Sequence, residues 1–161
     1  YFGKIQSLLA PVGVALVHAI GRKGGPGTTG KWLRKYIFPG GYIPSLSETM
    51  RGIEPCKLML TDCEILRRHY ALTLREWYKR CAEQEETITR IYDARFFRMW
   101  QFYLAGAEQG FRHGNLVNFQ FQTVKQRSAI PATRDYIEAE MLRLLAAEQA
   151  PEWHLDRKSV V

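Results

Sequence analysis

Val14-Ala-Leu-Val-His-Ala-Ile20 decides the fold, because it is a short and nearly continuous apolar run. Such a run is typical of a strand buried on both faces of a sheet. It follows an amphipathic stretch, Ile5 to Ala10, which is typical of a helix, and a turn at Pro11-Val12-Gly13. Helix, tight turn and buried strand form half of the repeating unit of a parallel α/β sheet. We therefore expect the chain to begin inside a doubly wound α/β fold, with the earlier strands missing from this sequence.

The segment after this strand alternates between loops and short elements. Gly21 to Gly30 is a loop by composition, and it has neither the Walker ending nor the GxGxxG spacing of a nucleotide site. Trp32 to Phe38 has helical spacing, and Ser45 is placed to cap a short helix that reaches Gly52. A brief strand is expected near Lys57 to Leu60.

The second half predicts long helices around one clear strand. From Leu66 the pattern is helical, and a second helix is expected from Ala94 through Phe111, with an aromatic face. Val117 to Thr123 alternates strictly, which is the period of a strand with two different faces. Arg134 to Ala150 is expected to be an added amphipathic helix, followed by a polar tail from Glu152.

Composition limits the class of protein. A chain of 161 residues, 46% of them hydrophobic, can bury one ordinary core. The net charge of +7 suits a phosphate-bearing partner, either nucleic acid or anionic lipid. No nucleic-acid-binding motif is present, so a nucleic-acid partner is not expected. The basic residues Lys31, Arg34 and Lys35 around Trp32 suggest docking on anionic headgroups, although a solvated face explains them as well.

Cysteine usage and hydropathy bear on the compartment. The three cysteines lack the paired spacing of a zinc site or a redox motif, so no metal is expected and a reduced, cytoplasmic chain fits best. No apolar run approaches the roughly 18 residues of a membrane span. Any membrane association is therefore expected to be peripheral.

Four sequence blocks, in order, carry a family resemblance: Leu16-Val-His-Ala-Ile-Gly21, Lys35-Tyr-Ile-Phe-Pro-Gly-Gly-Tyr-Ile-Pro-Ser45, His69-Tyr-Ala-Leu-Thr-Leu-Arg-Glu-Trp77 and Tyr92 through Arg112. Together they resemble the cyclopropane-fatty-acyl-phospholipid and mycolic acid cyclopropane synthases, from Tyr1 to about Ile137. The resemblance implies the C-terminal part of a class I fold dependent on S-adenosylmethionine (SAM), an α/β fold with a mixed sheet and helical insertions. Residues 1–133 would be catalytic domain and 134–161 a helical extension with a polar tail.

The resemblance also implies a reaction. A cis double bond in an unsaturated phospholipid acyl chain receives the methyl group of SAM, and a bound bicarbonate removes a proton from the resulting carbocation to close the ring. The family places its cofactor loop and an active-site glutamate upstream of Tyr1, so no cofactor-binding residue is expected here and the fragment alone should be inactive.

Three residues match the family's bicarbonate ligands: His18, Tyr70 and, through its backbone N–H, Ile20. An imidazole, a phenol and an amide can together donate to a small anion. The alternatives are a core histidine bonded to a backbone carbonyl and a tyrosine that only packs. An ionisable ring within a buried strand is costly without a function, which favours the ligand role for His18.

The expected acyl-binding residues are aromatic or lie in the Phe-Pro-Gly-Gly-Tyr block: Phe38, Gly40, Tyr42, Trp100 and Tyr103. A packed core explains the aromatic face equally well. Ala107 departs from relatives that carry a cysteine at this position. The neighbouring Glu108 could substitute for that cysteine, but a solvated glutamate is the favoured expectation.

Two other functions remain open. One is a related SAM-dependent lipid methyltransferase that leaves a methyl branch, and the other is a non-catalytic, peripheral lipid-binding module. The sequence also leaves open whether the protein forms a homodimer.

Overall fold

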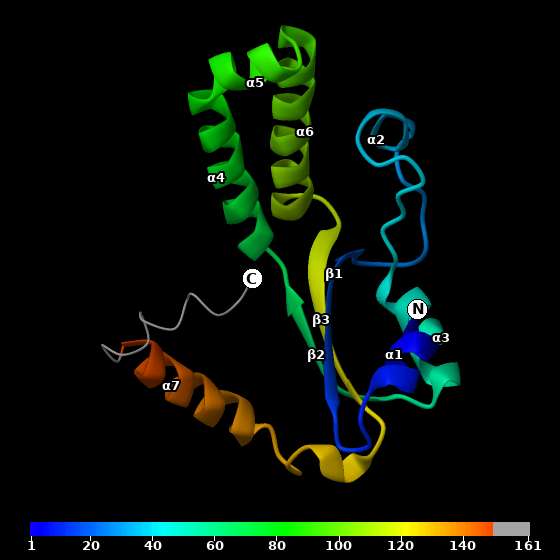
Figure 1. Ribbon diagram of the computed structural model, residues 1–161. Helices are drawn as coiled ribbons and strands as arrows, with labels where there is room; N and C mark the ends of the chain where they lie inside the picture. The colour runs from blue at the N-terminus through cyan, green and yellow to red at the C-terminus, as the bar shows by residue number, and fades with distance from the viewer. Residues whose placement is uncertain (150–161) are drawn as a thin grey trace.

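The computed structural model describes residues 1–149 and contains one small sheet with helices on both sides (Figure 1). In chain order the elements are α1 (Phe2–Leu8), β1 (Val14–Arg22), α2 (Lys31–Tyr36), α3 (Leu46–Ile53), the 3-10 turn η1 (Glu54–Cys56), β2 (Met59–Leu66), α4 (His69–Glu83), α5 (Glu85–Ile91), α6 (Ala94–Arg112), β3 (Leu116–Val124), the 3-10 turn η2 (Arg127–Ala129) and α7 (Asp135–Gln149). The polar tail expected from Glu152 lies outside the described residues.

The sheet has the order β1-β3-β2, and both outer strands run antiparallel to β3. His18 lies opposite Gln120, and Glu64 lies opposite the same residue on the other side. The two outer strands are therefore parallel to each other and both end where β3 begins. This edge of the sheet collects three chain segments that are distant in the sequence.

The strand Val14 to Ile20 is confirmed, but its expected burial on both faces is wrong. Burial alternates along β1, and Leu16 remains 64% exposed. Among the described strands β1 pairs with β3, and its last residue, Arg22, also forms a single bridge with Ser45. The helices packed on β1 cover mainly the Val17 face. An apolar run does not reveal which of its two faces will be covered.

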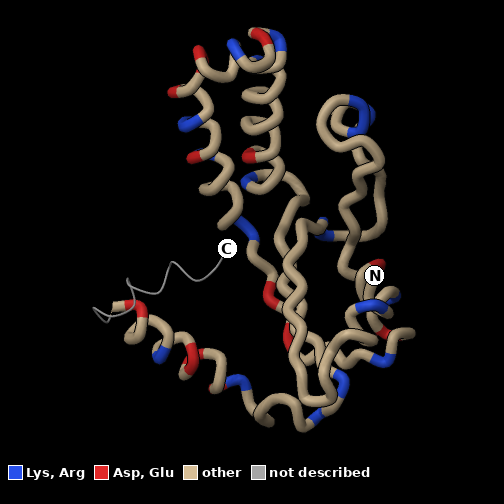
Figure 2. The backbone as a smooth tube through the Cα atoms, in the orientation of Figure 1, with Lys and Arg blue, Asp and Glu red and all other residues tan. Residues whose placement is uncertain are grey.

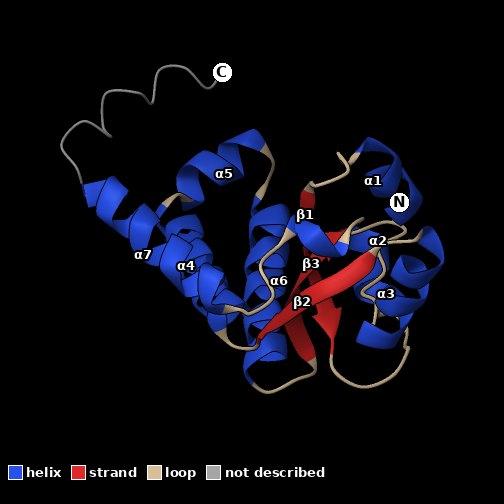
Figure 3. Cartoon of the chain, turned by 90° about the horizontal axis from the view of Figure 1, so that it is seen from below, coloured by secondary structure: helices blue, strands red, loops and turns tan. Residues whose placement is uncertain are grey.

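One face of the sheet packs on α1 and α3 (Figure 3). The buried residues of this sheet cluster are Ile53, Leu58, Val117, Phe119 and Phe121. A Cβ atom added at Gly21 would lie 2.0 Å from the Phe119 ring, so glycine is required where β1 crosses this ring. The predicted cap of α3 is also confirmed, because Ser45 and Glu48 form a capping box.

The helices α4 and α6 form an antiparallel hairpin joined by α5, which the sequence did not predict as a separate helix. Its hairpin cluster consists of Ala71, Leu74, Cys81, Phe97, Leu104 and Phe111. The helix expected from Leu66 begins only at His69, because β2 continues to Leu66 through its pairing with Asn118. The strand predicted near Lys57 to Leu60 was correspondingly too short.

The predicted C-terminal helix is present as α7, and it runs away from the base of the sheet (Figure 1). None of its residues is buried. Tyr136 donates to Gln122 Oε1 at 3.0 Å, and Arg134 pairs with Asp62 on β2. None of the helices in residues 1–149 is both long enough and apolar enough to cross a membrane.

Candidate functional site

An apolar cavity of about 610 Å³ lies between α2, the end of β1 and the α4–α6 hairpin. We call it the apolar pocket. Its lining is Ile20, Thr29, Trp32, Leu33, Phe38, Gly41, Tyr42, Ile43, Tyr70, Phe102, Tyr103, Gly106, Ala107, Phe111 and Leu116. No charged side chain lines it, and its size is that of a small-molecule pocket. The cavity suits an apolar ligand with few polar groups.

Aromatic contacts join the α2 segment to α6 across this pocket. The rings of Trp32 and Phe102 meet edge to face with centroids 5.2 Å apart, and Phe38 meets Tyr103 in the same way at 5.6 Å. Phe38 is placed by a turn in which the amide of Gly41 donates to the Phe38 carbonyl at 2.9 Å. Gly40 has φ +74° in this turn, a conformation that glycine adopts without strain.

Two of the three predicted bicarbonate ligands reach the apolar pocket. Tyr70 enters it from the first turn of α4, and Ile20 from the end of β1. The amide of Arg22 donates to the Pro44 carbonyl at 3.0 Å, away from β3. Because N–H directions repeat every second residue of a strand, the Ile20 amide is expected to point away from β3 as well. The two residues offer a phenol and an amide donor.

His18 does not line the apolar pocket. Its side chain is exposed, so the premise of a histidine inside a buried strand is wrong. Its ring Nδ1 lies 3.1 Å from the Gln120 side-chain nitrogen. If Nδ1 accepts from this amide, the ring proton is on Nε2 and is available to another acceptor. His18 is two residues from Ile20 on the same strand face, and its ligand role stays a prediction.

The predicted acyl-binding residues divide between the pocket and its surroundings. Phe38, Tyr42 and Tyr103 line the apolar pocket, whereas Gly40 and Trp100 do not. Gly40 is an exposed turn residue. Trp100 packs beside Tyr103 with ring centroids 5.0 Å apart, and so supports a lining residue from behind.

The sequence did not identify Phe102 or Thr29 as pocket residues. Phe102 lies on α6 beside the aromatic face that the helical spacing selected. It becomes a pocket residue because the position of α2 brings Trp32 against its ring. The Thr29 hydroxyl lines the pocket, is buried and has no hydrogen-bond partner among the described residues. A buried hydroxyl without a partner is costly, so it favours a polar ligand group at that point.

The tyrosines of the pocket keep their protons. Burial raises the pKa of Tyr70, and burial together with the neighbouring Tyr70 raises the pKa of Tyr103. The hydrogen bond that Tyr42 donates to Glu48 at 2.5 Å raises the pKa of Tyr42. All three phenols are therefore neutral donors near pH 7.

Glu108 is buried rather than solvated, which corrects the expectation for this residue. It accepts from Arg112 Nε at 2.6 Å and lies 3.2 Å from Arg75 Nε on α4. The carboxylate thus ties α4 to the end of α6. Glu108 does not line the apolar pocket, whereas Ala107 does, so its carboxylate does not substitute there for the cysteine of the relatives.

Comparison with known proteins identifies the family of the chain. Residues 1–121 match the family model of mycolic acid cyclopropane synthetase. The chain is 35% identical to the tuberculostearic acid methyltransferase of Mycobacterium tuberculosis (strain ATCC 25618 / H37Rv) over 132 residues, 78% of this chain and 31% of that protein. It is 34% identical to the cyclopropane-fatty-acyl-phospholipid synthase of Escherichia coli (strain K12), over 70% of this chain and 29% of that protein. The chain thus spans about a third of the length of these relatives.

Solved structures share the fold. A cyclopropane synthase from Mycobacterium tuberculosis superposes with a TM-score of 0.69 at 27% identity, covering 76% of this chain and 47% of that one. Other chains with this fold are methyltransferases, including one solved in complex with S-adenosyl-L-methionine. The fold is therefore that of the SAM-dependent methyltransferases, as expected from the sequence. The fold, the match to the family model and the sequence identity to these relatives agree. The chain therefore belongs to the mycolic acid cyclopropane synthetase family.

Proposed function

We propose that this protein transfers the methyl group of SAM to the cis double bond of an unsaturated phospholipid acyl chain and closes a cyclopropane ring. The observation that carries the proposal is the uncharged, aromatic pocket of about 610 Å³ that contains Tyr70 and Ile20. The double bond would lie among these side chains, at an anionic membrane surface to which the protein binds peripherally.

The aromatic lining suits the intermediate of this reaction. Methyl transfer to an alkene leaves positive charge on the acyl chain, and the faces of aromatic rings attract a cation. Phe38, Tyr103 and Phe111 supply such rings, and the pocket offers no carboxylate that would trap the cation. Exclusion of water by the same apolar side chains prevents its hydration.

Bicarbonate would be held by the Ile20 amide, the Tyr70 hydroxyl and His18 Nε2–H. The Ile20 amide, inferred to point away from β3, and the protonated Tyr70 hydroxyl fit an anion, since both groups are donors. The bound bicarbonate would act as the base that removes a proton from the new methyl group as the ring closes.

The apolar pocket lacks a group that sites for SAM commonly use. The ribose hydroxyls of SAM are commonly held by a carboxylate, and the apolar pocket has none. We therefore assign the apolar pocket to the acyl side of the reaction and assign no cofactor ligand to it.

Tyr70→Phe and His18→Ala test the assignment in the full-length protein. Loss of one donor to the bound anion should lower lipid methylation about 100-fold for Tyr70→Phe, and His18→Ala should nearly abolish it. The measurement is transfer of labelled methyl from SAM into phospholipid, with product mass spectrometry. Tyr78→Phe, on the same helix but outside the apolar pocket, is the matched control. Full activity of His18→Ala would refute the proposed role.

A methyl-branched product is the second candidate, because the relative with 35% identity is named a tuberculostearic acid methyltransferase. Chromatography and mass spectrometry of the released fatty acids separate a ring from a branch. A protein that binds lipid but transfers no methyl group would instead be a non-catalytic lipid-binding module.

A further inference from the structure

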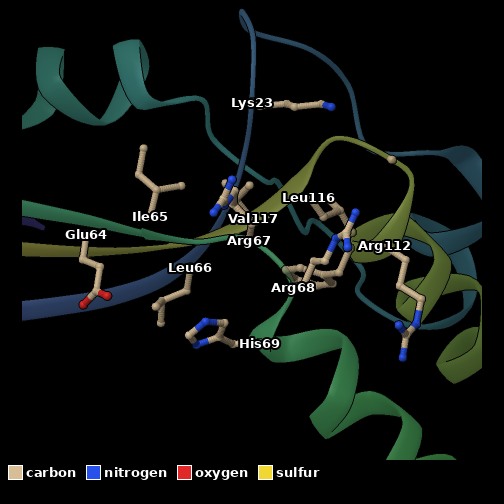
Figure 4. Close-up of a pocket in the computed structure, with 12 residues that line it drawn as sticks. Lys23, Glu64, Ile65, Leu66, Arg67, Arg68, His69, Arg112, Leu116 and Val117 are labelled. Atoms are coloured by element: carbon tan, nitrogen blue, oxygen red, sulfur yellow. The ribbon is translucent and has the colours of Figure 1, made fainter.

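A second cavity, of about 650 Å³, opens at the edge of the sheet where β1 and β2 end and β3 begins (Figure 4). We call it the basic pocket. Its charged lining residues are Lys23, Arg67, Arg68, Arg112 and Glu64, and His69 lies beside them. Figure 4 shows Arg67 and Arg68 between the Lys23 loop and His69 at the start of α4.

The fold brings these cations together from three places in the chain. Lys23 follows β1, Arg67 and Arg68 follow β2, and Arg112 ends α6 just before β3. The Lys23 amide donates to the Asn115 carbonyl at 2.8 Å, which joins the loop after β1 to the one before β3. Figure 2 shows the basic residues gathered where β2 runs into α4 and where α6 ends.

The basic pocket has an excess of positive charge. Four Lys and Arg side chains line it against the single carboxylate of Glu64. Arg112 is paired with Glu108, whereas the ion pairs within residues 1–149 do not include Lys23, Arg67 or Arg68. Cations that outnumber the carboxylates of a pocket attract an anion, and guanidinium groups match the geometry of phosphate oxygens.

Helix α4 adds to this attraction. Arg68 is its N-cap residue, no side chain caps this end, and no acidic side chain occupies its first turn. The positive end of the helix dipole therefore acts with the arginines rather than being neutralised locally.

The basic pocket adjoins the apolar pocket, because Phe111 and Leu116 line both cavities. One wall thus separates an uncharged aromatic cavity from a cationic one. A phospholipid combines these two chemistries in one molecule, since an acyl chain and a phosphate are joined through glycerol. A free phosphate would use only the basic pocket and would leave the adjoining apolar cavity unexplained.

We propose that the basic pocket binds the headgroup phosphate of the phospholipid whose acyl chain enters the apolar pocket. Arg67 and Arg68 make the phosphate contacts, and Lys23 closes the pocket from the loop after β1. The inference rests on the proposed phospholipid substrate, but it concerns binding and is tested without the methyl transfer.

The test compares two double variants of the full-length protein that remove equal charge. Arg67→Gln with Arg68→Gln alters the basic pocket, and Arg80→Gln with Arg90→Gln alters the far end of the helical hairpin. Binding is measured to vesicles of phosphatidylglycerol and to vesicles of digalactosyldiacylglycerol with the same acyl chains. Circular dichroism verifies that both variants are folded. Inorganic phosphate is titrated separately by calorimetry.

The basic-pocket variant should bind phosphatidylglycerol vesicles about tenfold more weakly than the wild type, whereas the control should lose less than about threefold. Binding to galactolipid vesicles should be weak and equal in all three proteins. Equal losses in both double variants would overturn the proposal, because general surface charge would then explain the binding. The proposal would also be overturned if binding of inorganic phosphate depended on Arg67 and Arg68 while vesicle binding did not.

If the basic-pocket variant loses vesicle binding but the wild type transfers no methyl group, the phosphate site stands and the proposed reaction fails. If methyl transfer to phospholipid occurs but is as fast in the basic-pocket variant as in the wild type at limiting lipid, the reaction stands and the phosphate site fails.

Discussion

The two apolar clusters of this chain differ in the way they meet the surface. The sheet cluster is closed by α1 and α3, and Phe119 and Phe121 are only 2% and 1% exposed. In the hairpin cluster Leu74 and Leu104 are buried, but aromatic residues of the same cluster, such as Phe111, also line the apolar pocket. Closure favours stability, whereas an open aromatic rim offers a binding surface. Substitutions in the two clusters should therefore separate stability from function.

The largest effect is expected in the closed cluster. Phe119→Ala removes a ring that packs on Phe121 and fills the space above Gly21, and it should lower the free energy of unfolding by about 3–5 kcal/mol. The measurement is urea unfolding followed by circular dichroism.

Phe102→Ala is the matched control, since this ring is 66% exposed on the rim of the apolar pocket. It should change stability by less than about 0.5 kcal/mol while it weakens binding of the lipid. Similar destabilisation by both variants would show that the rim is part of the folded core.

A smaller loss of stability is expected at the ion pairs of Glu108, which connect the two helices of the hairpin. Glu108→Gln removes the carboxylate between Arg75 and Arg112 and should cost about 2 kcal/mol, between the values for buried and surface ion pairs. Because Arg112 also lines the basic pocket, its guanidinium is expected to shift and alter vesicle binding.

The control for this pair is Glu76→Gln, which removes an exposed partner of Lys79 on the same hairpin. Its stability should stay close to that of the wild type. If Glu108→Gln were equally neutral, the carboxylate would not be holding α4 to α6.

The smallest effect is expected at the cap of α3, which covers the sheet cluster. Ser45→Ala removes the hydroxyl that accepts from the Glu48 amide, and should cost about 1 kcal/mol in thermal or chemical unfolding. Ser47→Ala, an exposed residue in the same helix, should cost less.

The capping box also predicts a pH dependence. Hydrogen bonds from the Ser45 amide and Tyr42 hydroxyl lower the pKa of Glu48 below its ordinary value of 4.5. The stability that ionised Glu48 contributes to the fold is therefore complete above its unfolded-state pKa. It is lost as the pH falls through the lower folded-state pKa. Glu48→Gln should reduce this acid sensitivity, and an unchanged pH profile would contradict the assignment.

Local patterns predicted the elements well where the signal lies within a few residues. The alternation of Val117 to Thr123 identified β3, and Ser45 identified the start of α3, because pleat and cap are local properties. The same patterns missed the extension of β2 to Leu66. That extension depends on pairing with Asn118, more than 50 residues away in the sequence.

The candidate site was predicted in part. The family resemblance led to Tyr70 and Phe38, and the aromatic face of the helix from Ala94 led to Tyr103; the fold brings all three to one cavity. The same two signals also selected Gly40, which forms a turn, and Trp100, which supports Tyr103 from behind. A sequence match marks positions that matter but does not distinguish a residue that touches the ligand from one that places it.

The sequence by itself determined most of the helices and strands, the family and the aromatic character of the hairpin, because these follow from local spacing and from matched motifs. Only the tertiary structure decided which face of β1 is covered, that Glu108 is buried, and that Lys23, Arg67 and Arg112 meet at one edge of the sheet. The physical reason is the same in each case. Burial and charge clustering depend on strand pairing and helix packing between segments far apart in the chain, and no local window contains that information.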